Sequence, residues 1–190
     1  MTIQELFIIS NQELKRVVVQ IADNQWDLAL PAVMSARPTT IQQAVRNHTY
    51  DDAWVPDMLA GKAQAEVGKV YESLLVSENI KADYSHYNQR AVDTVSDFRD
   101  LDKICHLSYG DYPARQYLQH VISFRAFRSY DFAKLIGADD AMPADFVQAL
   151  SDEFSPIIET YRQMGVFPPA IEVPNNAGPQ AKLLAMVGRK

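Results

Sequence analysis

The chain has 190 residues, of which 47% are hydrophobic, and this supplies enough apolar surface for one domain with its own core. Its 18 basic and 24 acidic residues give a net charge of -6, the wrong sign for a protein that neutralises nucleic-acid phosphates. The single cysteine, Cys105, excludes an internal disulfide. We therefore expect no nucleic-acid partner, and a reducing compartment such as the cytoplasm.

The first residues contain one short apolar run, Leu6 to Ile9, with Glu5 before it. A secretory signal has a longer apolar region followed by a small-residue cleavage pattern. A membrane-spanning helix needs roughly 20 apolar residues in succession. The sequence has neither pattern, so we expect no signal peptide and no membrane partner.

Apolar residues at three- and four-residue spacings predict a first amphipathic helix that extends to about Ala22. These residues are Leu6, Ile9, Leu14, Val17, Val18 and Ile21. The next stretch, Asp23 to Pro38, also contains Pro31. We expect it to be a connection that packs against the other helices.

A second helix is predicted to begin after Thr39 or Thr40, because each threonine is followed by glutamine three residues later, as in a capping box. Gly61 is expected to end this helix, and Pro56 to kink or shorten its last turn. Residues 62–81 are compatible with a helix but lack a clear period.

A stripe of apolar residues predicts the third helix: Tyr84, Tyr87, Ala91, Val95 and Phe98. This pattern is lost between Arg99 and Tyr112, where Gly110 and Asp111 predict a turn. Pro113 is expected at the first position of a fourth helix that ends at Gly137.

A fifth helix is predicted from near Pro143 to Gly165, with an irregularity at Pro156. The proline-rich tail ends in a short helical patch, Leu183–Val187. Amphipathic helices without a convincing strand predict an all-α protein, an up-and-down four-helix bundle. We expect a single domain over 1–190, with the bundle core at about 4–137 and an extension at about 138–190 that carries the extra helix and tail.

Three segments of the chain resemble one family. The first is His48-Thr-Tyr-Asp-Asp-Ala-Trp-Val-Pro-Asp-Met-Leu-Ala-Gly61. The second is Gly110-Asp-Tyr-Pro113 with Tyr130-Asp-Phe-Ala-Lys-Leu-Ile-Gly137, and the third is Val173-Pro-Asn-Asn-Ala-Gly-Pro with Leu183-Leu-Ala-Met-Val-Gly-Arg189. In order and spacing they are similar to the DinB-like, mycothiol-dependent maleylpyruvate isomerase group of helical bundles.

This resemblance implies a divalent metal held by one histidine on the second helix and by two ligands one turn apart on the later helix. His48 matches the first ligand, while the other two positions fall on Phe124 and Arg128. Phenylalanine has no donor atom, and arginine stays protonated without a lone pair to offer. The ligand pattern implied by the family is therefore incomplete.

The resemblance predicts a pocket formed by five residues: His48, Asp52, Phe124, Arg128 and Asp131. His48 and Asp52, four residues apart on one helix face, could share a zinc or nickel ion, or His48 could hydrogen-bond a carboxylate instead. The guanidinium of Arg128 could replace the cation, with Asp52 or Asp131 as its partner. His120, one turn before Phe124, is a further possible ligand.

The other candidate residues have structural interpretations. Asp51 and Asp57 are expected at solvated positions, and His86 and His106 at surface or capping positions. Cys105 is expected to be a buried, inert thiol, because the adjacent His106 cannot face it within a helix or strand. Two further residues at family positions, Tyr130 and Trp54, fit either pocket support or helix packing equally well.

Two functions remain open from the sequence. One is a degenerate DinB-like member without a cofactor, which keeps the bundle and acts as a module for binding a small molecule or for interaction with another molecule. The other is a metal-dependent transferase or isomerase that uses a low-molecular-weight thiol such as mycothiol, with zinc or nickel as its cofactor. A homodimer is a possible assembly for either.

Overall fold

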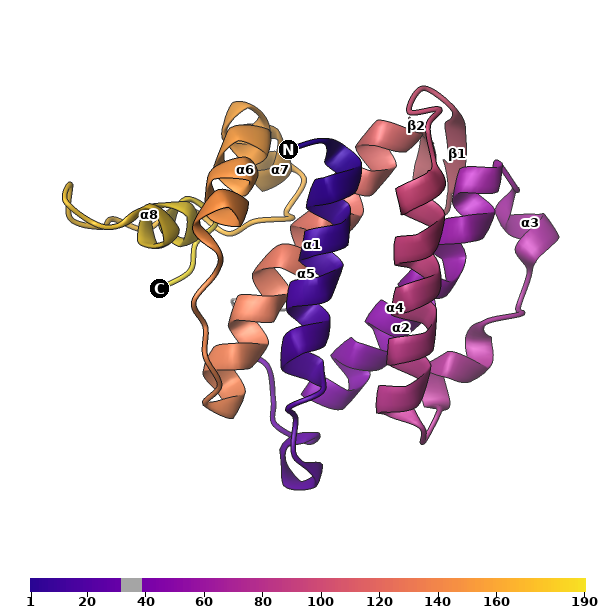
Figure 1. The fold of residues 1–190 in the computed structure, drawn as a ribbon, viewed down its shortest axis with the longest axis horizontal. Helices are drawn as coiled ribbons and strands as arrows, with labels where there is room; N and C mark the ends of the chain where they lie inside the picture. Colours follow the sequence, from indigo (N-terminus) through magenta and orange to yellow (C-terminus); the bar gives the residue numbers. More distant parts are fainter. Residues whose placement is uncertain (32–38) are drawn as a thin grey trace.

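The computed structural model describes residues 1–31 and 39–190, and helices make up most of it (Figure 1). The four long helices are α1 (Ile3–Val18), α2 (Ile41–Ala60), α4 (Ile80–Asp97) and α5 (Ala114–Ile136). The predicted connection after α1 is described as far as Pro31 and contains the short η1 (Asp23–Gln25). Its remaining residues, with Pro38, lie outside the described residues.

The helix ends follow local sequence signals. Thr40 and Gln43 form the capping box of α2, one of the two alternatives predicted. Gly61 ends α2 and Gly137 ends α5 in the left-handed conformation, with φ of 81° and 74°. α2 remains α-helical through Pro56 to Ala60, so the proline does not shorten the helix.

The order of the helices differs from a simple up-and-down bundle. Arg46 near the start of α2 donates to the carbonyl of Ser77, just before α4, and Lys103 beyond the end of α4 donates to the last carbonyl of α2. α2 and α4 therefore run in the same direction. The crossover between them contains α3 (Gln64–Val67) and η3 (Glu72–Val76).

The crossover also covers part of α2. Asp57 is 8% exposed and accepts hydrogen bonds from Lys62 and from the hydroxyl of Tyr71, at 2.7 and 2.8 Å. The expectation that Asp57 is solvated was wrong, because residues outside its helix bury it. The third predicted helix also begins earlier than Tyr84, at Ile80.

The expectation of an all-α chain was wrong at one place. β1 (Ile104–Leu107) and β2 (Gly110–Pro113) form an antiparallel hairpin before α5, with Cys105 opposite Tyr112. Gly110, with φ of 138°, is the first residue of β2 and not part of the turn. A pair of four-residue strands is too short to give an alternating pattern that stands out in the sequence.

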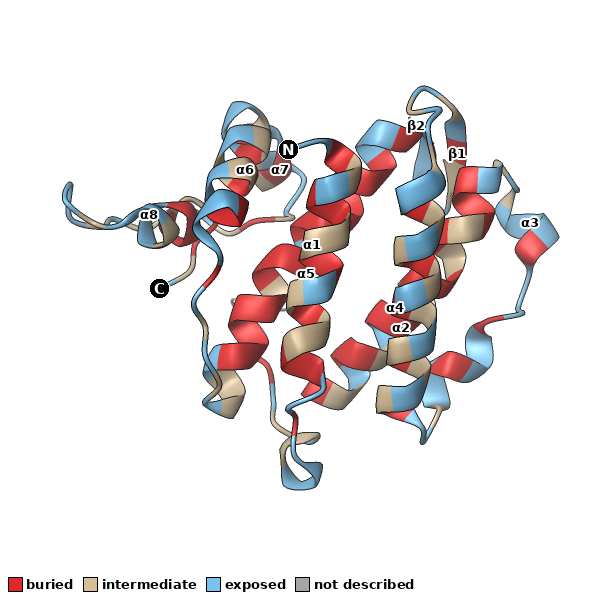
Figure 2. Cartoon of the chain, in the orientation of Figure 1, coloured by how far each residue is buried: buried red, intermediate tan, exposed pale blue. Residues whose placement is uncertain are grey.

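Residues after α5 add a smaller layer on one side of the bundle (Figure 2). It consists of α6 (Ala144–Phe154), η4 (Ser155–Ile157), α7 (Ile158–Gln163) and α8 (Pro179–Met186). The break at η4 confirms the irregularity predicted at Pro156. Phe154 and Phe167 pack edge-to-face against Phe127 of α5, with ring centroids 6.0 and 5.4 Å away, so the C-terminal region shares the core of the bundle.

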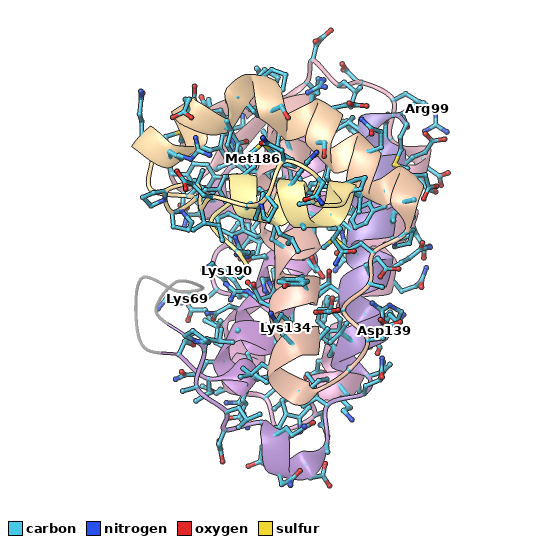
Figure 3. The ribbon with its side chains drawn as sticks, turned by 90° about the vertical axis from the view of Figure 1, so that its left-hand side faces the viewer. Lys69, Arg99, Lys134, Asp139, Met186 and Lys190 are labelled. Carbon is cyan, nitrogen blue, oxygen red and sulfur yellow. The ribbon has the colours of Figure 1, made fainter. Side chains whose placement is uncertain are left out.

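The last residues are tied to α5. Arg189 makes a bidentate contact with Asp131, at 2.8 and 3.0 Å, and Lys134 donates to the carbonyl of Lys190 at 2.7 Å. Figure 3 shows Lys134 and Lys190 on the side of the molecule where α8 crosses the bundle. No helix among the described residues is both long and apolar enough to cross a bilayer.

Candidate functional site

A buried polar cluster joins α2 to α5. Arg125 of α5 is 1% exposed and donates two hydrogen bonds to one carboxylate oxygen of Asp52, at 2.8 and 3.2 Å. It also donates to the ring Nδ1 and, at 3.2 Å, to the backbone carbonyl of His48. Close backbone contacts run from α5 to α1, from α1 to α4 and from α4 to α2. Arg125 thus bridges the remaining side of the bundle, between α2 and α5.

The second oxygen of Asp52 is held by α4. Asn88 donates to it at 3.3 Å, and the same amide lies 2.9 Å from the side-chain oxygen of Asn11 on α1. Asp52 is fully buried. Burial raises the pKa of its carboxyl group, and Arg125 and Asn88 oppose that shift. All four long helices therefore contribute a side chain to one hydrogen-bonded network.

The contact with Arg125 fixes the tautomer of His48. A guanidinium can only donate, so Nδ1 of His48 must accept, and the ring proton is on Nε2. Nε2 is buried and has no hydrogen-bond partner among the described residues. Burial, with Arg125 and Arg128 nearby, holds the pKa of His48 well below its usual value. His48 is therefore a neutral imidazole with no lone pair left for another ligand.

Of the two residues that the resemblance implied opposite His48, Arg128 lies near it, but Arg125 takes the place of Phe124. Arg125 lies on the face of α5 that also carries Leu118 and Phe132, each seven residues away and buried. Phe124, which the resemblance implied at that place, is 49% exposed. A one-residue step rotates a helical side chain by about 100°. Most residues of α5 are buried, on several faces of the helix, so its sequence has no single apolar stripe that would have identified Arg125.

Arg128 and Asp131 form a second cluster one turn further along. Arg128 lies 3.8 Å from Asp131, which is one of the two partners predicted for it, and above the ring of Phe132. His48 contacts the same ring edge-to-face, with centroids 6.4 Å apart. The structure therefore brings His48, Asp52 and Arg125 together, and it places Asp131 with Arg128 and Arg189.

These donors do not fit a divalent metal. Nδ1 of His48 and one oxygen of Asp52 are already used by Arg125, whose positive charge would repel a cation. Within the part of the chain that the structure describes, no three His, Cys, Asp or Glu side chains gather as a metal site would require. The interpretation of His48 as bonded to a carboxylate was also wrong, because Arg125 lies between the two groups.

A cavity of about 320 Å³ lies between α2, α5 and the hairpin. Its lining residues are Tyr50, Asp51, Trp54, Met58, Gln64, His106, Leu107, Ser108, Tyr109, Tyr117, His120, Val121, Phe124 and Arg125. Arg125 is one of these lining residues, so the cavity borders the buried cluster. Tyr109 and Phe124 are 57% and 49% exposed, so a ligand in the cavity could cover apolar ring surface that water now contacts.

His120 was considered a replacement metal ligand, but its contacts are aromatic. Tyr109 lies 3.1 Å from its Nδ1, and the rings of Tyr112 and Tyr161 pack against it. Burial lowers its pKa, so it is neutral at pH 7. The predicted surface residue His106 lines the cavity and pairs with Asp111 at 2.9 Å, while His86 is exposed as expected.

Asp51 is the acidic residue of the cavity wall. Its side chain is 57% exposed and lies 3.8 Å from Arg125, too far for a hydrogen bond. Desolvation by the cavity wall, with Asp52 nearby, raises the pKa of Asp51 to about 6, and the water that reaches the side chain moderates this shift. Asp51 is thus a solvated residue, as predicted, but one that faces a cavity.

Comparisons with models of known protein families, with curated proteins and with solved structures found no match for this chain. The function proposed below therefore rests on the contacts of the chain's own residues. Cys105 adds no nucleophile to them, because it is fully buried in β1 and burial raises the pKa of its thiol to about 11.

Proposed function

We propose that the chain is a DinB-like helical-bundle protein that binds a small aromatic or apolar organic molecule and carries no metal. The observation behind this proposal is that Arg125 occupies the buried polar cluster between α2 and α5 and also lines an aromatic cavity. A concave, mainly apolar pocket with a few polar groups is the usual form of a small-molecule site. The single cysteine fits a cytoplasmic location.

The size of the cavity supports a small ligand. About 320 Å³ is at the lower end of the range for organic ligands, and it suits a compound built on a single ring. Tyr50, Trp54 and Tyr117 supply apolar walls, and each buried aromatic contact contributes both area and ring geometry to binding.

The alternative, a thiol-dependent transferase or isomerase, requires an ion to polarise the thiol. The guanidinium of Arg125 already occupies the space between His48 and Asp52 in which that ion would bind. An arginine supplies a fixed positive charge but no coordination site. This chemistry favours a binding module over a metal enzyme.

The test is ligand-detected NMR on the untagged full chain with a set of neutral single-ring aromatic compounds. We expect some of them to bind, and we expect binding to be lost in Val121→Phe, which adds volume at the cavity wall. Thermal unfolding of the variant checks that it remains folded. Absence of binding, or equal binding by the folded variant, would contradict the proposal.

Metal analysis addresses the alternative directly. Protein produced with added zinc and nickel and purified without a tag should contain neither ion in stoichiometric amount. One equivalent of either ion, lost in His48→Gln, would instead support the thiol-dependent enzyme.

A further inference from the structure

We propose that the ligand of the cavity is an organic cation, a small ammonium compound that carries an apolar or aromatic group. This inference rests on the proposed function and adds the charge class of the ligand. It is carried by two features of the same cavity: a carboxylate without a hydrogen-bonding partner, and aromatic rings around it.

The first feature is the charge balance. Asp51 and Arg125 are the charged lining residues, and Arg125 is committed to Asp52 and His48 through four hydrogen bonds. Because His48 is neutral, the group formed by Asp51, Asp52 and Arg125 has a net charge of one negative unit. No hydrogen bond to the Asp51 carboxylate exists among the residues that the structure describes, so this carboxylate is available to pair with a ligand cation.

The second feature is the composition of the wall. Tyr50, Trp54, Tyr109, Tyr117 and Phe124 all line the cavity. The face of an aromatic ring carries partial negative charge and attracts ammonium groups, and a cage of such rings is a known way to bind them. An anion would meet both these faces and Asp51 unfavourably, because the charge of Arg125 is already neutralised.

The position of Asp51 adds a pH dependence. Since desolvation raises the pKa of Asp51 above its usual value, its charge is lost at a higher pH than that of an ordinary carboxyl group, and cation affinity should fall with it. The titratable groups around Asp51 are Asp52 of α2, three residues of α5 and two of the hairpin; those of α5 are Arg125, Tyr117 and His120, and those of the hairpin are His106 and Tyr109. A pH dependence of cation binding is assigned to Asp51 only where it disappears when Asp51 is replaced.

The experiment compares three probes of similar size: phenethylammonium, 2-phenylethanol and phenylacetate. Trp26→Phe leaves Trp54, in the cavity wall, as the single tryptophan, and its fluorescence reports binding in the full-length chain. At pH 8 we expect phenethylammonium to bind about tenfold more tightly than the alcohol, and phenylacetate more weakly than either. Between pH 8 and pH 5 the preference for the cation should disappear.

Asp51→Asn, with Asp51→Ser as a second variant, should remove the difference between the cation and the alcohol and its pH dependence. Asp93→Asn, an exposed carboxylate on α4, is the matched control and should change nothing. Equal binding of the cation and the alcohol, or stronger binding of phenylacetate, would overturn the inference and leave the proposed binding function standing. Absence of binding by all three probes would count against both.

Discussion

Arg125 of α5 and Asp52 of α2 form a doubly hydrogen-bonded ion pair in which neither side chain is more than 1% exposed. The pair joins the two long helices on the side of the bundle where the cavity lies. The contact between α2 and α5 on this side therefore depends on two buried charges that must be present together.

Arg125→Met should destabilise the fold by about 3–5 kcal/mol, because it leaves the Asp52 charge buried without its partner. Adding Asp52→Leu should recover most of this loss. Urea unfolding measures both. Arg115→Met, at a half-exposed arginine of the same helix that pairs with Glu153, is the control and should cost less than about 1 kcal/mol. Equal losses for Arg115→Met and Arg125→Met would show that the buried pair contributes nothing special.

His48 should make the protein sensitive to mild acid. Its pKa in the folded state is well below the usual value, so its contribution to stability is complete above about pH 6.5 and is lost as the pH falls and the unfolded chain takes up the proton. The advantage of wild type over His48→Gln should shrink by up to about 1.4 kcal/mol per pH unit below that value. Urea unfolding of both proteins between pH 7.5 and pH 5 measures it; a constant difference would mean that His48 is not held neutral.

Asp131 should matter more for stability than Arg189. Asp131 is fully buried between Arg189 and Arg128, so Asp131→Ala leaves two positive groups near one another. Arg189→Ala leaves Asp131 with Arg128 at 3.8 Å. We expect a loss of about 3–5 kcal/mol for the first change and about 1–3 kcal/mol for the second. The reverse order in chemical denaturation would contradict this account of the C-terminal contact.

Two glycines with the same backbone conformation should respond differently to alanine. Gly137 and Gly188 have φ of 74° and 73°, but a Cβ at Gly137 meets no atom within 4 Å, whereas at Gly188 it would lie 2.8 Å from the carbonyl oxygen of Pro169. Gly137→Ala should cost about 1–2 kcal/mol from backbone strain alone. Gly188→Ala should cost clearly more and loosen the tail, seen as faster hydrogen exchange over 179–190.

Cys105 should be unreactive in the folded protein. Its thiol is fully buried and has a pKa of about 11, so almost no thiolate is present at pH 8. We expect a thiol reagent such as DTNB to label it at the rate of unfolding, and Cys105→Ala to keep the binding measured at the cavity. Rapid labelling, or loss of binding in the folded variant, would show an exposed or functional thiol.

The sequence by itself determined the features that depend on neighbouring residues. The capping box at Thr40, the stops at Gly61 and Gly137 and the break near Pro156 are set within one or two turns of the chain, and each lies where it was predicted. Local backbone preferences and hydrogen bonds decide these features, so they can be derived without the rest of the fold.

The tertiary structure decided the site. His48 was identified from the sequence, but the partner opposite it depends on the rotation of α5 about its axis, and this brought Arg125 inward and left Phe124 at the cavity wall. The burial of Asp57 depends on the crossover, where Tyr71 is distant from Asp57 in the sequence. The exposure of Asp51 to a cavity depends on the hairpin, whose two strands are short. Such contacts arise from packing between elements, where a shift of one residue exchanges one face of a helix for another.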